Sequence, residues 1–290
     1  RLECAFDNFV DVRGNSDREV ALLSRNMEID LAVDLGGGTQ DARTGIFFFF
    51  SAPIQASYIG YLGTMAANYM DYLIADKITI PEQSQCHYSE KIVYLPSYQA
   101  NDSKRSISEK RFERAELGLP DTGFVFCCFN NNYKITPAIF NVWMRILRRV
   151  RNSVLWLYAD NEQVMANLAM EAQLRGVDAR RLVFAKRLAP AEYLARYRAA
   201  DLFLDTLPYN AGTTASDALW AGLPVVTCTG EAFAARVAAS LLNVIGLPQL
   251  VTNTAVQYES LAVELAENAA KLNSIRQTLE RNRLTAPLFD

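Results

Sequence analysis

The sequence predicts an α/β protein with two lobes, each built on a parallel sheet flanked by helices. Short apolar stretches alternate with stretches of helical spacing along the 290 residues, and the connections between them are short. Such alternation is typical of doubly wound parallel sheets. The length suits two domains of ordinary size, and a hydrophobic content of 50% allows a large core.

Residues 1–110 are predicted to form the smaller, N-terminal lobe. A helix is expected at 16–26, because Ser16 and Glu19 have the spacing of a capping box. Strands are expected at 29–35, 54–60, 72–75 and 92–95. The aromatic run at 45–54 is shorter than the ~20 residues of a membrane helix and suggests a buried strand or hinge. The polar stretch at 100–110 is the predicted linker.

Residues 111–290 are predicted to form the second lobe, where the alternation is clearer. Strands are expected at 124–129, 154–158, 182–185, 202–204 and 225–227, and helices at 137–150, 162–175, 191–200, 215–221 and about 258–283. This order again indicates a parallel sheet.

The stretch at 201–227 indicates a strand, a loop, a helix and another strand. Thr213 or Thr214 is predicted to cap the helix, and Gly222 to end it. Ligands of open parallel sheets bind where a helix begins beyond a strand, and free amides at that point favour phosphate. The two hydroxyls are therefore candidate diphosphate donors. An ordinary helix cap is the alternative for an isolated Thr-Thr pair.

Two cations lie near the same predicted sheet edge. Lys134 follows the strand at 124–129, and Arg196 lies on the helix at 191–200. With the threonines they would neutralise a pyrophosphate and stabilise it as a leaving group. Asp217 could accept hydrogen bonds from ribose hydroxyls. Taken singly, Lys134 is more typical of a solvated turn and Arg196 of a helix surface.

Two glycine clusters follow predicted strands. In "IGYLGT", Gly60 and Gly63 lack side chains and would allow a ligand to approach the backbone closely. The triple glycine at 36–38 lacks GxGxxG spacing and is better explained as a turn.

Composition argues against several classes of protein. A net charge of −3 argues against a nucleic-acid surface, and no apolar run is long enough to cross a membrane. The only histidine, His87, has no suitable partner, so no metal is expected. The five cysteines lack CxxC spacing and indicate a reduced, cytoplasmic protein. Because the chain begins at Arg1 without a signal segment, a longer parent protein is expected.

Several motifs together resemble the catalytic region of the O-linked N-acetylglucosamine transferase family, above all its bacterial members with a tetratricopeptide array. They are "DLGGGTQDARTGIF", "YSEKIVYLP", "FCCFNNNYKITP" and "DTLPYNAGTTASDALWAGLPVVT". The resemblance implies two Rossmann-like lobes of the glycosyltransferase B type, with the N-terminal lobe truncated. It implies inverting transfer of N-acetylglucosamine from UDP-N-acetylglucosamine to Ser or Thr of acceptor proteins, without a metal cofactor. Upstream tetratricopeptide repeats are also expected.

The resemblance also assigns roles to residues of this chain. Lys134 matches a catalytic lysine on the diphosphate, Asn131 a nucleotide contact and Arg196 a donor-side arginine. The other matches are phosphate, ribose and sugar contacts at Thr213, Thr214, Asp217, Gly60 and Gly63.

Gly212 and Tyr193 are also predicted to contact the substrate, but each stands where the family has a histidine. An alternative is therefore a weakened or inactive homologue that acts as a binding or scaffold module. Because Spindly-type relatives use GDP-fucose, another donor is the third possibility.

Overall fold

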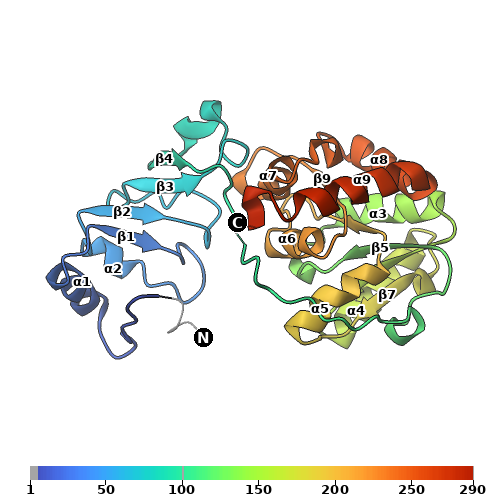
Figure 1. The fold of residues 1–290 in the computed structure, drawn as a ribbon, viewed down its shortest axis with the longest axis horizontal. Coiled ribbons are helices and arrows are strands. Elements are labelled where there is room, and N and C mark those ends of the chain that lie inside the picture. Colours follow the sequence, from blue (N-terminus) through green and yellow to red (C-terminus); the bar gives the residue numbers. More distant parts are fainter. Residues whose placement is uncertain (1–5, 100, 290) are drawn as a thin grey trace. The chain divides into compact units, whose positions relative to one another are not determined.

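The computed structural model describes residues 6–99 and 101–289. It divides into two compact units between Leu95 and Pro96, and each unit contains a parallel sheet, as the sequence predicts (Figure 1). The division lies earlier than the boundary predicted at residue 110. Residues 101–110 of the predicted linker belong to the second unit because they bond to it: Ser108 N donates to Ala191 O at 3.0 Å. Ala100, the first residue of that linker, lies outside the described residues.

The first unit contains a four-stranded sheet in the order β1-β2-β3-β4, with every pair parallel. Its strands are β1 Leu31–Asp34, β2 Ile54–Ser57, β3 Tyr72–Ala75 and β4 Lys91–Tyr94. Its helices are α1 Asp17–Asn26 and α2 Gly45–Phe48. The four predicted strands and the first helix are thus confirmed, with ends that differ by a few residues.

The aromatic run at 45–54 does not form the predicted buried strand or hinge. It begins with the short helix α2, and Phe48 and Phe50 are 57% and 58% exposed. The ring of Phe48 packs edge-on against Tyr69, with centroids 5.9 Å apart. Four consecutive bulky rings cannot all face one side of a strand, because successive side chains point to opposite faces.

The capping box at the start of α1 is confirmed. The backbone N of Glu19 donates to Ser16 Oγ at 3.3 Å, and the backbone N of Ser16 donates to Glu19 Oε2 at 2.7 Å. We expect Ser16→Ala to lower the free energy of unfolding of the first unit by about 1 kcal/mol, the usual loss for an N-cap. Urea unfolding measures it. Ser24→Ala, inside the same helix, is the control, and equal losses in both variants would contradict the cap's contribution.

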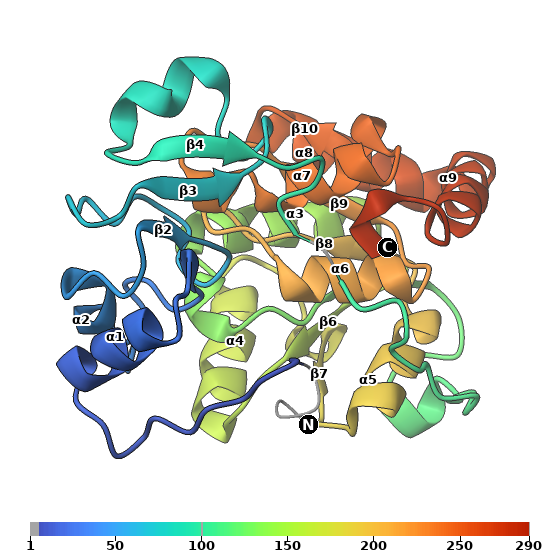
Figure 2. The ribbon, with the colours of Figure 1, turned by 60° about the vertical axis from the view of Figure 1, so that its left-hand side comes forward.

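The second unit contains a six-stranded parallel sheet in the order β10-β9-β8-β5-β6-β7. Helices cover both of its faces (Figures 1 and 2). Its strands are β5 Phe124–Cys128, β6 Ser153–Tyr158, β7 Leu182–Ala185, β8 Leu202–Leu204, β9 Val225–Cys228 and β10 Val251–Thr252. Its helices are α3 Pro137–Arg149, α4 Glu162–Leu174, α5 Pro190–Arg196, α6 Thr213–Trp220, α7 Val237–Val244, α8 Ala255–Glu267 and α9 Ala269–Asn282.

The strand order reverses between β5 and β8. From β5 the chain runs outward through β6 and β7, and it then returns to place β8 on the other side of β5. The predicted strands at 182–185 and 202–204 have the observed bounds. The single C-terminal helix expected at 258–283 is instead two helices, because Asn268 accepts a hydrogen bond from Lys271 N at 2.9 Å and caps α9.

The core of the second unit reaches the loop that follows β8. Trp143 and Tyr258 are fully buried, and Trp143 Nε1 donates to the Tyr258 hydroxyl at 3.2 Å. That hydroxyl donates to the carbonyl of Asp205 at 2.9 Å. The loop is therefore anchored to the hydrophobic core. No helix in the described part of the chain is long and apolar enough to cross a membrane.

Candidate functional site

The predicted site lies where the strand order of the second sheet reverses. β5 leads into Asn130–Lys134 and β8 leads into Asp205–Gly212, so the two loops flank the reversal at the carboxyl ends of the strands. Ligands of open α/β sheets bind in the crevice at such a point. The structure therefore brings the Lys134 loop and the Thr-Thr helix to one edge, as the sequence predicts.

Asp205 organises the loop that follows β8. Its carboxylate accepts hydrogen bonds from Thr206 N and Ala211 N, both at 2.7 Å, and from Thr227 Oγ1 at 2.6 Å. Burial raises the pKa of this carboxyl to about 6, although the hydrogen bonds and the charge of Lys134 act in the opposite direction. Asp205 thus fixes both ends of the loop over residues 205–211.

Lys134 lies against that loop. Its Nζ donates to the carbonyl of Asn210 at 2.9 Å and sits 4.1 Å from the centre of the Tyr209 ring. Burial lowers the pKa of Lys134, while the charge of Asp205 opposes this shift. An ammonium group has three donors, so two remain to bind an anionic ligand beside the loop.

Helix α6 begins beside the same loop without a side-chain cap. Gly212 is the N-cap residue, so the predicted Thr213 or Thr214 cap is wrong. Thr214 Oγ1 instead donates to Asn130 Oδ1, because Asn130 is 1% exposed and a buried amide needs a partner. The first-turn amides of α6 therefore lack a side-chain cap, and such a helix start favours an anion.

Hydrogen bonds connect the two halves of this edge. Asn130 Nδ2 donates to Thr206 Oγ1, and that hydroxyl donates to the Tyr209 carbonyl, both at 2.7 Å. Thr214 is thus linked through Asn130 to the loop that holds Lys134. Asn130 was not singled out from the sequence, although it directly follows a predicted strand.

An aromatic pocket of about 410 Å³ lies at the carboxyl ends of β5, β6 and β7. This volume falls within the ~300–1,000 Å³ usual for small-molecule sites. Three of the predicted site residues line it, namely Asn131, Tyr193 and Arg196, together with Phe129, Tyr158, Arg187, Leu188 and Pro190. The pocket therefore groups the candidate nucleotide contacts.

Arg196 is buried in the wall of this pocket. It is 2% exposed, so the alternative of a solvated helix-surface residue is wrong. Its guanidinium lies 3.9 Å from the Phe129 ring centre and 4.6 Å from that of Tyr193, and Nη1 donates to Lys186 O at 2.8 Å. Burial lowers the pKa of Arg196. The cation is held between two rings, while Lys134 contacts the loop after β8.

Two tyrosines and a carboxylate connect the pocket to α6. The hydroxyls of Tyr193 and Tyr197 are 2.7 Å apart, and the Tyr197 hydroxyl lies 3.3 Å from the carbonyl of Thr214. Tyr193 lies near enough to Asp217 to lower the pKa of its carboxyl. Burial raises the pKa of Asp217, and an ion pair with Arg105 opposes this shift. Tyr197 and Arg105 gave no signal in the sequence, because neither lies at a predicted strand end.

The glycine loop belongs to the first unit. A Cβ on Gly60 would lie 1.9 Å from the carbonyl oxygen of Leu35, so glycine is required there by the packing of the loop on its own chain. A Cβ on Gly63 would meet the Tyr61 ring at an ordinary 3.4 Å. The contact of these glycines with a sugar stays a prediction. The triple glycine forms a turn, as expected, with Gly37 at φ +57°.

Gly212, the position that departs from the family histidine, has space around it. A Cβ there would lie 3.6 Å from both Gln99 Oε1 and Val237 Cγ1, which is ordinary contact. Packing therefore does not require glycine at this position.

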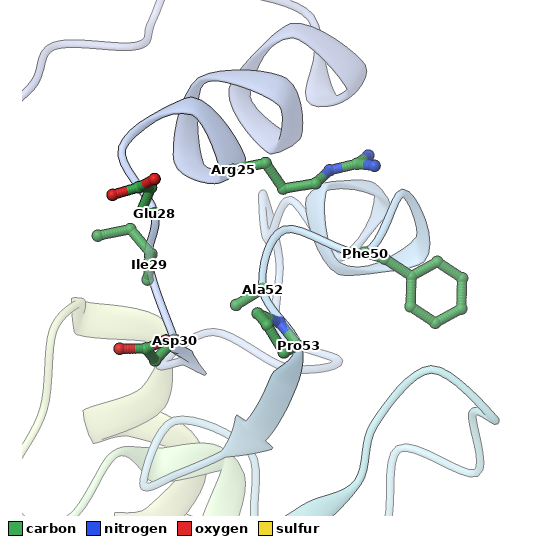
Figure 3. Close-up of a pocket in the computed structure, with 7 residues that line it drawn as sticks. All are labelled: Arg25, Glu28, Ile29, Asp30, Phe50, Ala52 and Pro53. Atoms are coloured by element: carbon green, nitrogen blue, oxygen red, sulfur yellow. The ribbon is translucent and has the colours of Figure 1, made fainter.

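A further hollow of about 690 Å³ lies in the first unit, between the end of α1 and the turn before β2 (Figure 3). Asp30 and Pro53 directly precede β1 and β2, and the ring of Phe50 extends away from them. This hollow is at the amino ends of the strands. Because parallel sheets bind ligands at their carboxyl ends, it is a poor candidate for the donor site.

Cysteine and metal chemistry receive no support from the described residues. No group of three His, Cys, Asp or Glu residues there could hold a metal ion. Cys127, Cys128 and Cys228 are free and buried, whereas Cys86 is free and exposed. Cys4 lies outside the described residues.

The raised pKa of Asp205 gives a pH prediction. Between about pH 4 and pH 6 the folded state keeps a proton that the unfolded state releases, so this stabilisation is present below pH 4 and is lost as the pH rises through 6. The quantity to compare is the unfolding free energy of the wild type minus that of Asp205→Asn. We expect this difference to be about 2 kcal/mol larger at pH 4 than at pH 7. Urea unfolding of both proteins at both pH values measures this, and a difference independent of pH would contradict it.

Comparison with known sequences gives one family match over nearly the whole chain. The family described as Glycosyl transferase family 41 matches residues 3–108 and 99–290. A probable UDP-N-acetylglucosamine–peptide N-acetylglucosaminyltransferase SEC of Arabidopsis thaliana is 38% identical over all of this chain and 30% of its own length. A Caenorhabditis elegans protein named as the same kind of transferase is 27% identical, over 90% of this chain and 32% of its own length. The chain thus spans about a third of these relatives.

Comparison with solved structures agrees. The O-GlcNAc transferase of Thermobaculum terrenum, in a K341M mutant, superposes with a TM-score of 0.88 and 30% identity, covering 99% of this chain and 55% of that one. Anabaena HepE in complex with UDP superposes with a TM-score of 0.60 at 16% identity, over 92% of this chain and 77% of its own. At 16% identity, the similarity to HepE shows a common fold and nothing more.

Proposed function

This chain belongs to glycosyl transferase family 41, and from that premise we propose that it transfers N-acetylglucosamine from UDP-N-acetylglucosamine to Ser or Thr hydroxyls of proteins, with inversion. Its two parallel-sheet units have the B-type glycosyltransferase fold. The names of its relatives supply the donor and the peptide acceptor. Since the chain spans about a third of their length, the activity of the whole protein, its cytoplasmic location and its upstream tetratricopeptide repeats are part of the proposal.

One observation carries the proposal: at the reversal of the strand order, Lys134 contacts the loop that leads directly into the uncapped start of α6. A cation with free donors and a helix start both favour a diphosphate. Thr213, which is exposed, and Thr214 add hydroxyls at the same place. We assign the diphosphate of the donor to this edge.

The uridine portion would occupy the aromatic pocket. Tyr193 offers a ring against which the base can lie, and Arg196 and Asn131 lie in the same wall. Asp217, which lies near Tyr193, would accept hydrogen bonds from the ribose hydroxyls. In this assignment the aromatic pocket holds the nucleoside, and the loop after β8 lies beside the diphosphate.

Transfer of the sugar is then promoted by stabilising the negative charge that develops on the leaving UDP. The acceptor oxygen forms a bond to the anomeric carbon and releases its proton to solvent water, while the bond from that carbon to the phosphate oxygen breaks and its electron pair leaves with UDP. Lys134 and the α6 amides stabilise this developing negative charge. Positive charge from the chain itself fills the role that a metal has in other transferases, and we expect no metal cofactor.

A second candidate function follows from Gly212 and Tyr193. Each stands where the family has a histidine, and a lost hydrogen bond to a charged phosphate lowers affinity by about 10- to 100-fold. A scaffold module that retains the fold would bind UDP weakly and transfer no sugar.

Calorimetric titration with UDP and with GDP tests the donor. We expect UDP to bind more tightly, and tighter binding of GDP would favour a donor such as GDP-fucose. An assay of sugar transfer to a peptide by the full-length protein then separates enzyme from scaffold. Absence of turnover in a protein that binds UDP would reject the enzyme and favour the scaffold.

A further inference from the structure

The segment before β5 reaches the candidate ribose site through one arginine. Arg105 pairs with the carboxylate of Asp217, and that side chain is 8% exposed. The two residues are 112 positions apart in the chain. On the basis of the proposed function, we propose that Arg105 is a positioning residue for nucleoside binding: it holds the Asp217 carboxylate beside Tyr193, ready to accept the ribose hydroxyls.

Arg105 is fixed to α6 by its backbone as well as by its side chain. Its carbonyl accepts a hydrogen bond from Trp220 Nε1 at 3.1 Å, one turn beyond Asp217 on the same helix. Trp220 is itself held, with its ring centre 4.9 Å from that of Phe289. The guanidinium therefore approaches Asp217 from a fixed backbone position, as a positioning role requires.

Asp217 lies between Arg105 and the aromatic pocket. Its carboxylate pairs with the guanidinium of Arg105, and it lies near Tyr193, which lines the pocket. Burial alone would favour the neutral acid, since it raises the pKa of Asp217, and the hydrogen bond and charge of Arg105 are the main opposing influences. An ionised carboxylate only accepts hydrogen bonds and can serve two hydroxyl donors. Without Arg105 this acceptor would be weakened.

The ion pair with Asp217 leaves two nitrogens of the Arg105 guanidinium without hydrogen bonds in the described part of the chain. Nε and Nη2 of Arg105 are buried and have no hydrogen-bond partner among the described residues. Arg–carboxylate pairs are frequently bidentate, with two parallel hydrogen bonds, but here Nη1 alone contacts the carboxylate, through Oδ1. An ionised carboxylate therefore keeps lone pairs that ribose hydroxyls can use.

The test compares UDP with 2′,3′-dideoxy-UDP, which lacks the ribose hydroxyls. Calorimetric titration of the full chain would use Arg105→Met, Arg105→Lys and the control Lys104→Met, which removes an exposed charge from the neighbouring position. We expect Arg105→Met to weaken UDP binding by about tenfold and dideoxy-UDP binding by less than about twofold. Because one nitrogen makes the contact, Arg105→Lys should recover most of the affinity. Lys104→Met should match the wild type.

A second comparison asks whether Arg105 acts through Asp217. In an Asp217→Asn background, Arg105→Met should cause no further loss of UDP affinity. Equal losses for UDP and dideoxy-UDP, an additive loss in the double variant or no recovery with lysine would overturn the inference. If Arg105→Met does not fold, Arg105→Gln replaces it. A wild type that fails to bind UDP would instead overturn the proposed function, and this inference with it.

Discussion

Replacing Lys134 with alanine is expected to lower kcat/KM for sugar transfer by about 10²- to 10³-fold, the usual loss when one charge-stabilising donor is removed. The reason is geometric: Nζ lies at the loop after β8, beside the uncapped start of α6, where the leaving diphosphate is assigned. Peptide transfer by the full-length protein measures the loss. The fold should survive, since the cation has no carboxylate partner within salt-bridge distance in the described residues.

The control for this variant is Lys271→Ala. Lys271 is a surface lysine on α9 that pairs with Glu264 at 2.7 Å, and such exposed pairs contribute little. It should leave both transfer and thermal stability nearly unchanged. Unchanged transfer in a folded Lys134→Ala protein would remove this residue from the mechanism and leave the diphosphate assignment without its cation.

Replacing Arg196 with methionine is expected to weaken UDP binding by about 10- to 100-fold. Methionine can fill the space between Phe129 and Tyr193, but it cannot donate to a base or to Lys186 O. The stability change should stay below about 2 kcal/mol, because no buried carboxylate is left without its partner among the described residues. Titration and thermal unfolding measure the two effects separately.

Uridine distinguishes the roles of the two cations. Without a diphosphate, uridine should lose affinity for Arg196→Met but bind Lys134→Ala as it binds the wild type. Arg198→Met, an exposed position two residues further along, is the matched control. A uridine affinity that falls equally in both cation variants would contradict the division between an aromatic pocket for the nucleoside and a loop for the diphosphate.

Much of the second unit could be predicted from its sequence, because its signals are local. An apolar run ended by Pro, Asn and Gly predicts the strand at 202–204 and its loop, whatever the rest of the chain does. The same holds for the capping box of Ser16 and Glu19, whose partners lie three residues apart. The succession of strands and helices along the chain came from such local signals, and with it the prediction that Lys134 and Thr214 lie at one sheet edge.

The sequence-based predictions were wrong where a contact with a residue far along the chain replaced the local interaction that the sequence pattern suggested. The hydroxyl of Thr214 was expected to cap its own helix, but a buried amide 84 residues away takes its hydrogen bond. Taken singly, Arg196 was more typical of a solvated helix surface, yet Phe129 and Tyr193 enclose it. The spacing of residue types along the sequence cannot predict such contacts, because they form only when strands from different parts of the chain lie together.

The α/β alternation, the family motifs and the sheet edge that carries the candidate site can be predicted from the amino-acid sequence. The strand order that reverses between β5 and β8, the grouping of the candidates into a pocket and a loop, and the pairing of Arg105 with Asp217 are seen only in the folded chain. Helix and strand patterns depend on neighbours a few residues away, whereas a binding site depends on which distant side chains are buried together.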